Sequence, residues 1–450
     1  MLRKILSYGL VEGLSKGLNK LSLLILPLLL TTVDYGKIGL LVSIELIIPL
    51  ISLLGFERAV LRFYNKKDRL PNFEKTVFSS VLIAHCLLFL LLLVLYISGV
   101  RSIFALDLFP DIFLILILIY FQGTNLITLN MLRVNEDHKR YFQGRVFIQV
   151  NRFILVFLFV YFSGSYLGYV VGSIMAAILS NVLFTGKSKG TLGGRFEKKT
   201  FTTLFVFSWP FIFHGVAGNL LGNADKFVLE RFMSLKEVGQ YTFAYSLGSS
   251  MMFAYIGISV YMEPLIYKEE DALRRSVLLN RFLFLTISSG ILAYILISIA
   301  SQYVLPRFYN STYTEVLSYI PLISSAFLLY PYYLQSNYEM IFKKKSLNIA
   351  VISVFSSILN IALNIYLIPI YGIYAAVFTT LVSYFVQALL FVLMSNGFKF
   401  NRKFAEVVLL GLLLSYCVYL KLEFYYVVCI MLAFQSYIYI FKVKPLLVKS

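Results

Sequence analysis

Long apolar stretches fill this chain of 450 residues almost from end to end, and only short polar connections separate them. Each stretch is about 20 residues long, the length that a helix needs to cross the hydrocarbon core of a bilayer. A helix also satisfies its backbone polar groups within its own segment, as lipid requires. The sequence therefore predicts an all-α integral membrane protein with fourteen transmembrane helices. The predicted spans are residues 8–31, 38–57, 76–99, 112–132, 146–162, 166–185, 201–222, 238–261, 282–304, 316–341, 347–368, 373–395, 404–420 and 423–441.

The composition excludes several classes of protein. Hydrophobic residues make up 59% of the chain and charged residues only 14%, well below the roughly 25% of a soluble domain. The formal net charge of +18 would suggest nucleic acid in a soluble protein, but here the basic residues lie in connections that face lipid headgroups. The three cysteines fall in predicted spans without paired spacing, and the three histidines do not cluster. We therefore expect no nucleic-acid partner, no metal site and no cofactor, and no cleavable signal peptide is recognisable.

The distribution of basic residues predicts the orientation. If the N-terminus is cytoplasmic, the inside connections carry 30 Lys and Arg residues and the outside connections carry 7. Cytoplasmic connections of membrane proteins are enriched in Lys and Arg. Both termini are therefore predicted to be cytoplasmic.

A faint internal repeat predicts the domain organisation. Segment Tyr35–Ser43 opens the second predicted span and Val238–Ser246 opens the eighth, with Gly36 and Gly239 at the same place in each. A repeat at this spacing predicts two six-helix lobes of equal orientation, related by a pseudo-two-fold axis along the membrane normal, as in many transporters. The predicted domains are residues 1–185 (helices 1–6), 186–200 (a cytoplasmic linker), 201–395 (helices 7–12) and 404–442 (helices 13 and 14).

Charged residues inside predicted spans are the first candidates for a site. Glu12, Lys16 and Lys20 follow each other at intervals of four residues, so that they share one helical face. Arg152 and Glu45 lie inside two other spans. Each charge at the centre of a membrane costs about 2.5–3.5 kcal/mol, which is acceptable only in a wet cavity or a paired network. Two interpretations stay open: a cavity that binds an anionic substrate, and a structural network of Glu12, Lys16, Glu45 and Arg152.

Polar and aromatic residues add weaker candidates. Tyr333, Gln335 and Asn337 lie in a tyrosine-rich part of the tenth span, where aromatic rings and amides could contact sugars or could simply pack the bundle. His214 lies within the seventh span, where it could take part in substrate binding or proton transfer, or only in packing. Glu12, Glu45 and His214 are the residues that could couple transport to an ion.

Short segments in a fixed order along the predicted spans carry a resemblance to a known family. They are Val33–Gly36, Gly55–Phe56, Ala59–Arg62, Trp209–Phe211, Asn223–Leu229, Val238–Tyr241, Asn360–Asn364 and Ile368–Ile373.

In their order and spacing, these segments resemble the polysaccharide-transport flippases of the multidrug/oligosaccharidyl-lipid/polysaccharide exporter superfamily, over about residues 6–393. The resemblance implies a flippase that moves undecaprenyl-diphosphate-linked oligosaccharide units, such as those of O-antigen in lipopolysaccharide, by alternating access. It implies a bacterial inner (cytoplasmic) membrane location, and partners that include membrane lipids, the polysaccharide polymerase and chain-length machinery. It also implies a basic central cavity. The acidic residues Glu12 and Glu45 do not match this basic pattern.

Two alternatives follow from other readings of the same spans. A cation-coupled multidrug exporter of the same superfamily would favour an acidic cavity and usually twelve spans, so the basic residues in spans argue against it. A membrane glycosyltransferase or polymerase would need large external loops with catalytic groups. The longest predicted external connection, residues 223–238, is too short for one, so the chain is not expected to be an enzyme.

Overall fold

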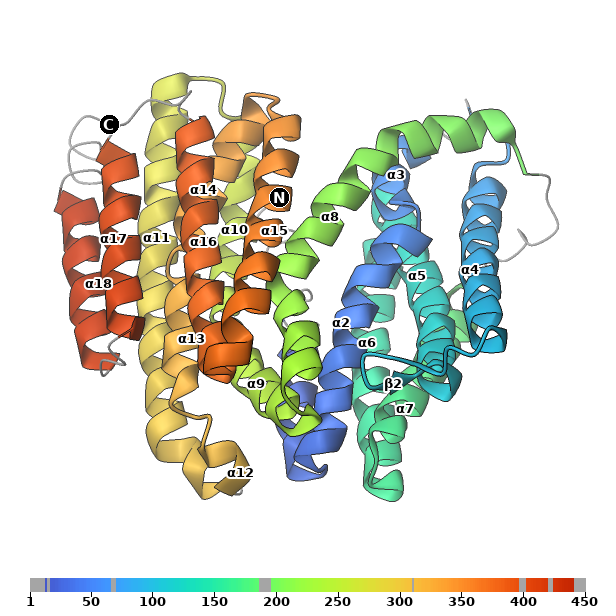
Figure 1. Ribbon diagram of the computed structural model, residues 1–450. Helices are drawn as coiled ribbons and strands as arrows, with labels where there is room; N and C mark the ends of the chain where they lie inside the picture. The colour runs from blue at the N-terminus through green and yellow to red at the C-terminus, as the bar shows by residue number, and fades with distance from the viewer. Residues whose placement is uncertain are drawn as a thin grey trace. The chain divides into compact units, whose positions relative to one another are not determined.

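The protein is described from a computed structural model that covers residues 13, 17–65, 70–185, 196–309, 311–395, 402–419 and 424–440. The chain divides into two compact units. We call Leu14–Gly239 the N-terminal unit, and the unit that runs from Gln240 onward the C-terminal unit. Figure 1 shows that both are built almost wholly of helices.

The described part of the N-terminal unit consists of helices and one small hairpin (Figure 1). Its elements are an apolar helix Gly17–Leu28, α2 (Thr32–Ser52), α3 (Phe56–Phe63), α4 (Phe73–Ile97), β1 (Ser102–Ile103), β2 (Leu106–Asp107), a π-helical turn (Leu108–Ile112), α5 (Phe113–Val134), α6 (His138–Ser163), α7 (Tyr166–Ser180), a second π-helical turn (Asn181–Thr185) and α8 (Lys198–Phe232). The strands β1 and β2 pair antiparallel. Helix α9 (Leu235–Gly248) begins in this unit and continues into the next.

Local sequence signals explain where several of these helices begin. The hydroxyl of Thr31 accepts a hydrogen bond from the backbone N–H of Asp34 at 3.1 Å, which caps α2. The carboxylate of Asp137 accepts from the N–H of Arg140 at 3.2 Å and caps α6. Side-chain oxygens at these positions satisfy N–H groups that have no partner within the helix.

The second predicted span, residues 38–57, is wrong in its bounds. Helix α2 begins six residues earlier, at Thr32, and ends at Ser52, after an internal Pro49. Leu54 and Gly55 then take left-handed conformations with φ of 56° and 67°, and α3 starts at Phe56. Glycine adopts this conformation without strain, so Gly55 is where the chain can break one helix and begin another.

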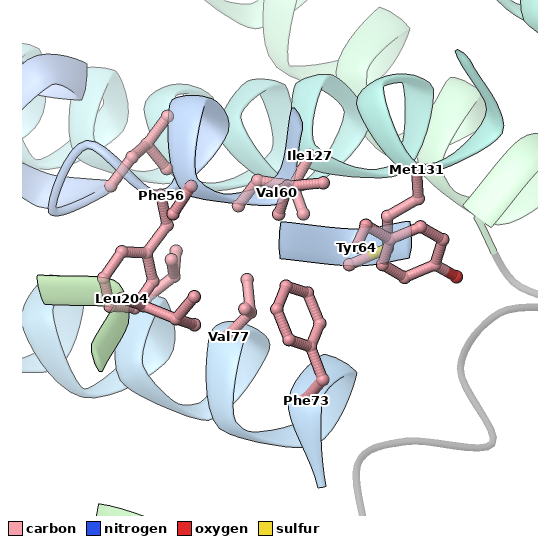
Figure 2. Close-up of a cluster of buried hydrophobic side chains, with 11 residues drawn as sticks. Phe56, Val60, Tyr64, Phe73, Val77, Ile127, Met131 and Leu204 are labelled. Carbon is pink, nitrogen blue, oxygen red and sulfur yellow. The ribbon is translucent and has the colours of Figure 1, made fainter. Parts of the chain in front are cut away.

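An apolar cluster joins helices of the N-terminal unit that are far apart in sequence (Figure 2). Phe56 and Val60 of α3, Val77 of α4, Ile127 of α5 and Leu204 of α8 are fully buried in it. In Figure 2 their side chains point toward one another from different helices. Burial of such side chains stabilises a structure by about 1.5–3 kcal/mol each when water is the alternative.

Two glycines allow the first turn of α9 to lie directly against α2. A Cβ atom at Gly36 would lie 2.2 Å from the carbonyl oxygen of Leu235, and one at Gly239 would lie 2.0 Å from that of Thr32. The contact is reciprocal, because each glycine faces the carbonyl four residues before the other. Gly36 and Gly239 are the glycines that the sequence aligns in its faint repeat, and small residues permit such close helix crossings in membranes.

The C-terminal unit is wholly helical in the part that the structure describes (Figure 1). Its elements are a 3₁₀ turn (Ser249–Met251), α10 (Met252–Lys268), α11 (Ala272–Ile299), a π-helical turn (Ala300–Val304), a 3₁₀ turn (Leu305–Arg307), α12 (Ser311–Thr314), α13 (Tyr319–Phe327), α14 (Tyr330–Phe342), α15 (Ser346–Tyr371), α16 (Ile373–Ser395), α17 (Arg402–Tyr419) and α18 (Phe424–Ile438). The predicted span 316–341 is divided into α13 and α14 at Leu328–Leu329.

Neutral polar side chains connect α15 to α16 in this unit. Asn360 donates from Nδ2 to the hydroxyl of Ser383 at 3.1 Å, and Asn364 donates to Oδ1 of Asn360 at 3.0 Å. Thr379 donates to Oδ1 of Asn364. Asn360, Asn364, Thr379 and Ser383 are completely buried, so the network satisfies polar groups that lipid could not.

Nine of the described helices are long and apolar enough to cross a membrane, and α8 makes a tenth if its two bent halves form one span. These halves meet at 44° between Trp209 and Phe211. Proline removes a backbone donor, and Pro210 stands at this bend. The chain is a multi-pass membrane protein, and the exact number of fourteen spans stays a prediction. The predicted external connection 223–238 is wrong, because α8 continues to Phe232 and α9 starts at Leu235.

Candidate functional site

A buried ion pair joins α2 and α6 in the N-terminal unit. The guanidinium group of Arg152 on α6 contacts both carboxylate oxygens of Glu45 on α2, with Nη1 2.7 Å from Oε1 and Nη2 3.0 Å from Oε2. Their side chains are only 18% and 8% exposed. This two-point geometry is the strongest form of an Arg–carboxylate contact.

Two neutral side chains complete this ion pair. Tyr169 on α7 donates from its hydroxyl to Oε2 of Glu45 at 3.1 Å and accepts from Nη2 of Arg152 at 2.8 Å. Gln122 on α5 donates to Oε1 of Glu45 at 2.9 Å. The carboxylate therefore receives hydrogen bonds from α5, α6 and α7. These hydrogen bonds help to offset the cost of removing both charges from water, as a buried ion pair requires.

A second group of polar residues lies on the helix Gly17–Leu28, α2 and α8. The ammonium nitrogen of Lys226 on α8 donates to Oδ1 of Asn223 at 2.9 Å and to the hydroxyl of Ser43 on α2 at 3.5 Å. Lys226 is only 4% exposed. Lys20 lies close enough that the two positive charges repel each other. We call Lys20, Lys226, Asn223 and Ser43 the lysine cluster.

An acid stands next to the lysine cluster. Asp225 is completely buried, and its charge attracts that of Lys226. Its Oδ1 atom accepts a hydrogen bond from the backbone N–H of Lys226 at 2.9 Å. Lys20, Lys226 and Asp225 together carry one net positive charge when all three are ionised. The arrangement can therefore hold an anionic group more readily than a cation.

The structure describes contacts for three of the charged residues predicted from the sequence. Arg152 and Glu45 are joined in the ion pair, which corresponds to part of the predicted structural network. Lys20 instead lies beside Lys226. Glu12 and Lys16 lie outside the described residues, and so does the side chain of His214. The roles assigned to these residues stay predictions.

The three predicted residues of the tenth span lie on α14 in the C-terminal unit. Gln335 is 2% exposed and donates to the carbonyl oxygen of Leu279 at 3.0 Å on α11. The ring of Tyr333 packs edge-on against Phe391 of α16, with 4.7 Å between the ring centroids. Among the described residues, the buried Oδ1 atom of Asn337 has no hydrogen-bond partner. Gln335 and Tyr333 thus connect helices, whereas Asn337 keeps an acceptor available.

Sequence reasoning missed Gln122 and Tyr169, and for Lys226 it favours a helix-terminal role over a role as a ligand. Lys226 was assigned to an external connection, although Asn219, Asn223 and Lys226 are spaced as one face of a continuous helix. Gln122 and Tyr169 are polar residues inside otherwise apolar spans, which is a signal, but the sequence does not say that both meet Glu45. Only the packing of α2, α5 and α7 brings them together.

Comparison with solved structures defines the class of fold. The structure is similar to one titled "Lipid II flippase MurJ, inward closed conformation", with a TM-score of 0.70 at 16% sequence identity over 96% of each chain. It is also similar to an inward-facing multidrug resistance MATE family transporter of the MOP superfamily, with a TM-score of 0.66 at 12% identity over 87% of this chain and 94% of that chain. The chain has the fold of these membrane transporters.

The family follows from the sequence. The profile of the family described as "Polysaccharide biosynthesis protein" matches residues 1–251, which is more than half of the chain. The chain belongs to this family, and the resemblance predicted from its short segments is confirmed. Among curated proteins, none matches the chain.

Proposed function

We propose that this protein is a flippase that moves an oligosaccharide linked to a polyprenyl diphosphate from the cytoplasmic to the periplasmic leaflet. The observation that carries the proposal is the lysine cluster. Lys20 and Lys226 bring two ammonium groups close together, so that they repel each other, and Lys226 donates to the neutral oxygens of Asn223 and Ser43. An anion that binds between the two lysines relieves this repulsion.

A diphosphate fits this chemistry better than a neutral sugar or a drug-like cation. Phosphate oxygens accept charge-assisted hydrogen bonds, and Lys is a common phosphate ligand. The ammonium groups of Lys20 and Lys226 are the charged donors of the cluster, and an ammonium group offers a cation no acceptor. Membership of a polysaccharide biosynthesis family supports a sugar attached to that diphosphate.

The proposed mechanism is alternating access by two lobes. The lobes are residues 1–185 and 201–395, each with six helices, followed by helices 13 and 14 in residues 404–442, for fourteen in all. The reciprocal contact of Gly36 with Leu235 and of Gly239 with Thr32 supports a pseudo-two-fold relation, since a two-fold axis makes contacts reciprocal. In this mechanism the diphosphate binds at the lysine cluster while the polyprenyl chain stays in lipid.

The proposed location is a bacterial inner membrane with both termini in the cytoplasm, as the basic connections suggest. The inside-negative potential would then favour outward movement of the substrate. Each charge gains about 2.3 kcal/mol per 100 mV, so a diphosphate with two charges gains about 4.6 kcal/mol if the lysines do not move with it. The polymerase and chain-length machinery are the partners that would use the exported unit.

The ion pair of Arg152 and Glu45 has a different proposed role. All of its hydrogen bonds to Gln122 and Tyr169 lie inside the N-terminal unit, which supports the structural interpretation. Ion coupling through Glu45, Glu12 or His214 stays a hypothesis. If Glu45 couples an ion, transport by a Glu45→Gln variant loses its dependence on pH and on sodium.

The experiment compares lysine variants in cells that depend on this protein for surface polysaccharide. Lys226→Gln and Lys20→Gln should reduce export at least tenfold and cause lipid-linked oligosaccharide to accumulate, while the amount of protein in the membrane stays normal. The matched control is Arg140→Gln, which removes one charge from an exposed residue of the same unit.

Normal export in both lysine variants would contradict the proposed substrate site. Inhibition of export by drug-like cations would favour the alternative, a cation-coupled multidrug exporter. Bond formation or cleavage in the sugar chain by the purified protein would favour a glycosyltransferase or polymerase.

A further inference from the structure

Helix α14 has one partly exposed side in the C-terminal unit. Tyr330, Tyr333 and Asn337 are spaced by three and four residues, so they lie along this side, and each is partly exposed. Leu334 and Ile341 lie on the same side and add apolar surface. The buried residues of α14 lie around the rest of the helix and are Pro331, Tyr332, Gln335, Ser336, Tyr338 and Met340. Two phenol rings and one amide of this helix therefore reach the surface on one side.

Helix α16 adds a second amide beside this side of α14. The ring of Tyr384 packs against Tyr330 with 6.5 Å between the ring centroids, and that of Phe391 packs against Tyr333 at 4.7 Å. Gln387 follows Tyr384 by three residues and precedes Phe391 by four, so it lies on the same side of α16 as both. It is 6% exposed. We call Tyr330, Tyr333, Asn337 and Gln387 the tyrosine–amide face.

The polar groups of the tyrosine–amide face are not used by the protein within the described ranges. The Oδ1 atom of Asn337 is buried there without a hydrogen-bond partner. The hydroxyls of Tyr330 and Tyr333 and the amide of Gln387 likewise make no hydrogen bond to a described residue. In contrast, Tyr255 of α10, whose ring stacks on Tyr330 at 6.0 Å, donates to the carbonyl oxygen of Phe327 at 3.0 Å. Because lipid cannot satisfy polar groups, this face requires water or a ligand.

The neighbouring helix α15 shows what a side turned toward lipid looks like in this unit. Leu347, Val351, Phe355 and Ile358 follow each other at intervals of three or four residues, and each is at least 52% exposed. All four are apolar, as contact with hydrocarbon requires. The tyrosine–amide face differs from this surface, because two phenols and two amides replace aliphatic side chains. Its composition therefore indicates a ligand that forms hydrogen bonds.

The charge of the tyrosine–amide face specifies the ligand further. All four of its residues are neutral, and the charged residue of α14, Glu339, lies on the opposite side of the helix and pairs with Lys403 at 3.5 Å. Phenol hydroxyls and amides both donate and accept hydrogen bonds, which suits a neutral ligand with several hydroxyl groups. Aromatic rings add apolar faces, against which the C–H groups of a sugar ring pack. A diphosphate would find no cation on this face, in contrast to the lysine cluster.

We propose that the tyrosine–amide face binds neutral sugar residues of the transported oligosaccharide. The inference rests on the proposed function, because that function supplies a ligand with sugars. Asn337 and Gln387 would hydrogen-bond sugar hydroxyls, and the rings of Tyr330 and Tyr333 would pack against the sugar. The sugar part of the substrate then has its own binding residues, which differ in chemistry from the lysines that bind the diphosphate.

The test measures binding by saturation-transfer difference NMR, with the purified full chain in a detergent that has no sugar headgroup. The probes are maltotriose, the trisaccharide of N-acetylglucosamine, and triethylene glycol dimethyl ether, which has no hydroxyl group. Transfer to at least one trisaccharide and none to the ether supports the site. No transfer to either trisaccharide, or equal transfer to the ether, overturns it. Binding of farnesol that is lost in the variants below would identify a polyprenyl chain as the occupant and would also overturn it.

Variants locate the binding within the molecule. Asn337→Leu with Gln387→Leu removes both amides and should weaken binding of the active trisaccharide at least tenfold. Tyr333→Phe removes only a hydroxyl and keeps the ring contact with Phe391, so it should weaken binding severalfold. The matched control is Tyr366→Phe on α15, which removes the hydroxyl of a tyrosine that is 72% exposed elsewhere in the same unit. It should bind as the unmodified chain does.

If the double amide variant and Tyr333→Phe both elute as folded protein and bind the trisaccharide normally, the tyrosine–amide face is not the sugar site. Binding of a free trisaccharide needs neither a diphosphate nor transfer, so this result would leave the proposed flippase activity untouched. Trisaccharide binding by a chain that transfers no lipid-linked oligosaccharide in proteoliposomes would instead overturn the flippase and leave the sugar site.

Discussion

The N-terminal unit connects α2 to α6 through an ion pair, whereas the C-terminal unit connects α15 to α16 through neutral amides and hydroxyls. Arg152 and Glu45 contact each other at two points and form hydrogen bonds with Tyr169 and Gln122. Asn360 and Asn364 form the corresponding network with Ser383 and Thr379. Both networks satisfy buried polar groups of helices that lie in lipid.

The difference between them lies in what happens when a partner is lost. A neutral amide without its partner loses one modest hydrogen bond, since such bonds in membranes average about 0.6 kcal/mol. A buried carboxylate without its cation remains as an uncompensated charge, which costs several kcal/mol. The N-terminal unit therefore depends on a few charged residues, and it is also the unit that contains the lysine cluster.

The largest effect on stability is expected from Arg152→Met. This change leaves Glu45 buried without its cation and should lower the free energy of unfolding by about 3–5 kcal/mol. Chemical unfolding in mixed micelles measures it. The double variant Glu45→Leu with Arg152→Met removes both charges and should recover most of the loss. If the double variant is less stable than the single one, the ion pair is not the source of the effect.

The close crossing of α2 and α9 provides the next test. Gly239→Ala places a Cβ atom 2.0 Å from the carbonyl oxygen of Thr32, so the helices must separate. Such overpacking typically costs about 1–3 kcal/mol. Gly218→Ala is the matched control, because a Cβ atom there meets nothing within 4 Å. It should be neutral or stabilising, since Ala favours helix by up to about 1 kcal/mol over Gly.

A smaller effect is expected in the C-terminal unit. Asn364→Ala removes hydrogen bonds to Asn360 and Thr379 without leaving a charge, and should cost about 0.6–1.7 kcal/mol. A double-mutant cycle with Thr379→Val measures the interaction of this pair. A loss as large as that of Arg152→Met would remove the distinction between the charged and the neutral network.

The smallest effect is expected for an Arg–carboxylate ion pair that is exposed to solvent. The pair of Arg140 and Asp137 has its atoms 3.6 Å apart, and the Arg140 side chain is 65% exposed. Arg140→Gln should change the free energy of unfolding by less than about 1 kcal/mol, because water screens exposed ion pairs. The comparison with Arg152→Met isolates the contribution of burial to an ion pair of the same kind.

The sequence predicted the class of fold because apolar length is a local property of a helix in lipid. It placed helix bounds less well where a break depends on one residue, as at Gly55, or where a polar residue continues a helix, as at Lys226. Glu45 and Arg152 were both recognised as candidates. Their pairing, and the position of Lys20 near Lys226, depend on how helices pack and could not be read from spacing along the chain.

The aligned glycines illustrate the opposite case. Gly36 and Gly239 were aligned only because two short segments look alike, which is weak evidence on its own. The packing gives this alignment a physical reason, because both positions must lack a side chain where the backbones approach. The weak sequence repeat gains support here because both of its glycines lie in one helix contact.

We propose above that the lysine cluster binds the diphosphate of a lipid that crosses the bilayer. Its most direct test is transfer of a polyprenyl-diphosphate oligosaccharide between leaflets of proteoliposomes that contain the purified chain. The unmodified protein should transfer this lipid. The double variant Lys20→Gln with Lys226→Gln should lower the rate at least about tenfold, since a hydrogen bond to a charged group contributes about 1.5–3 kcal/mol. Equal rates for the unmodified and the double-variant protein would contradict it.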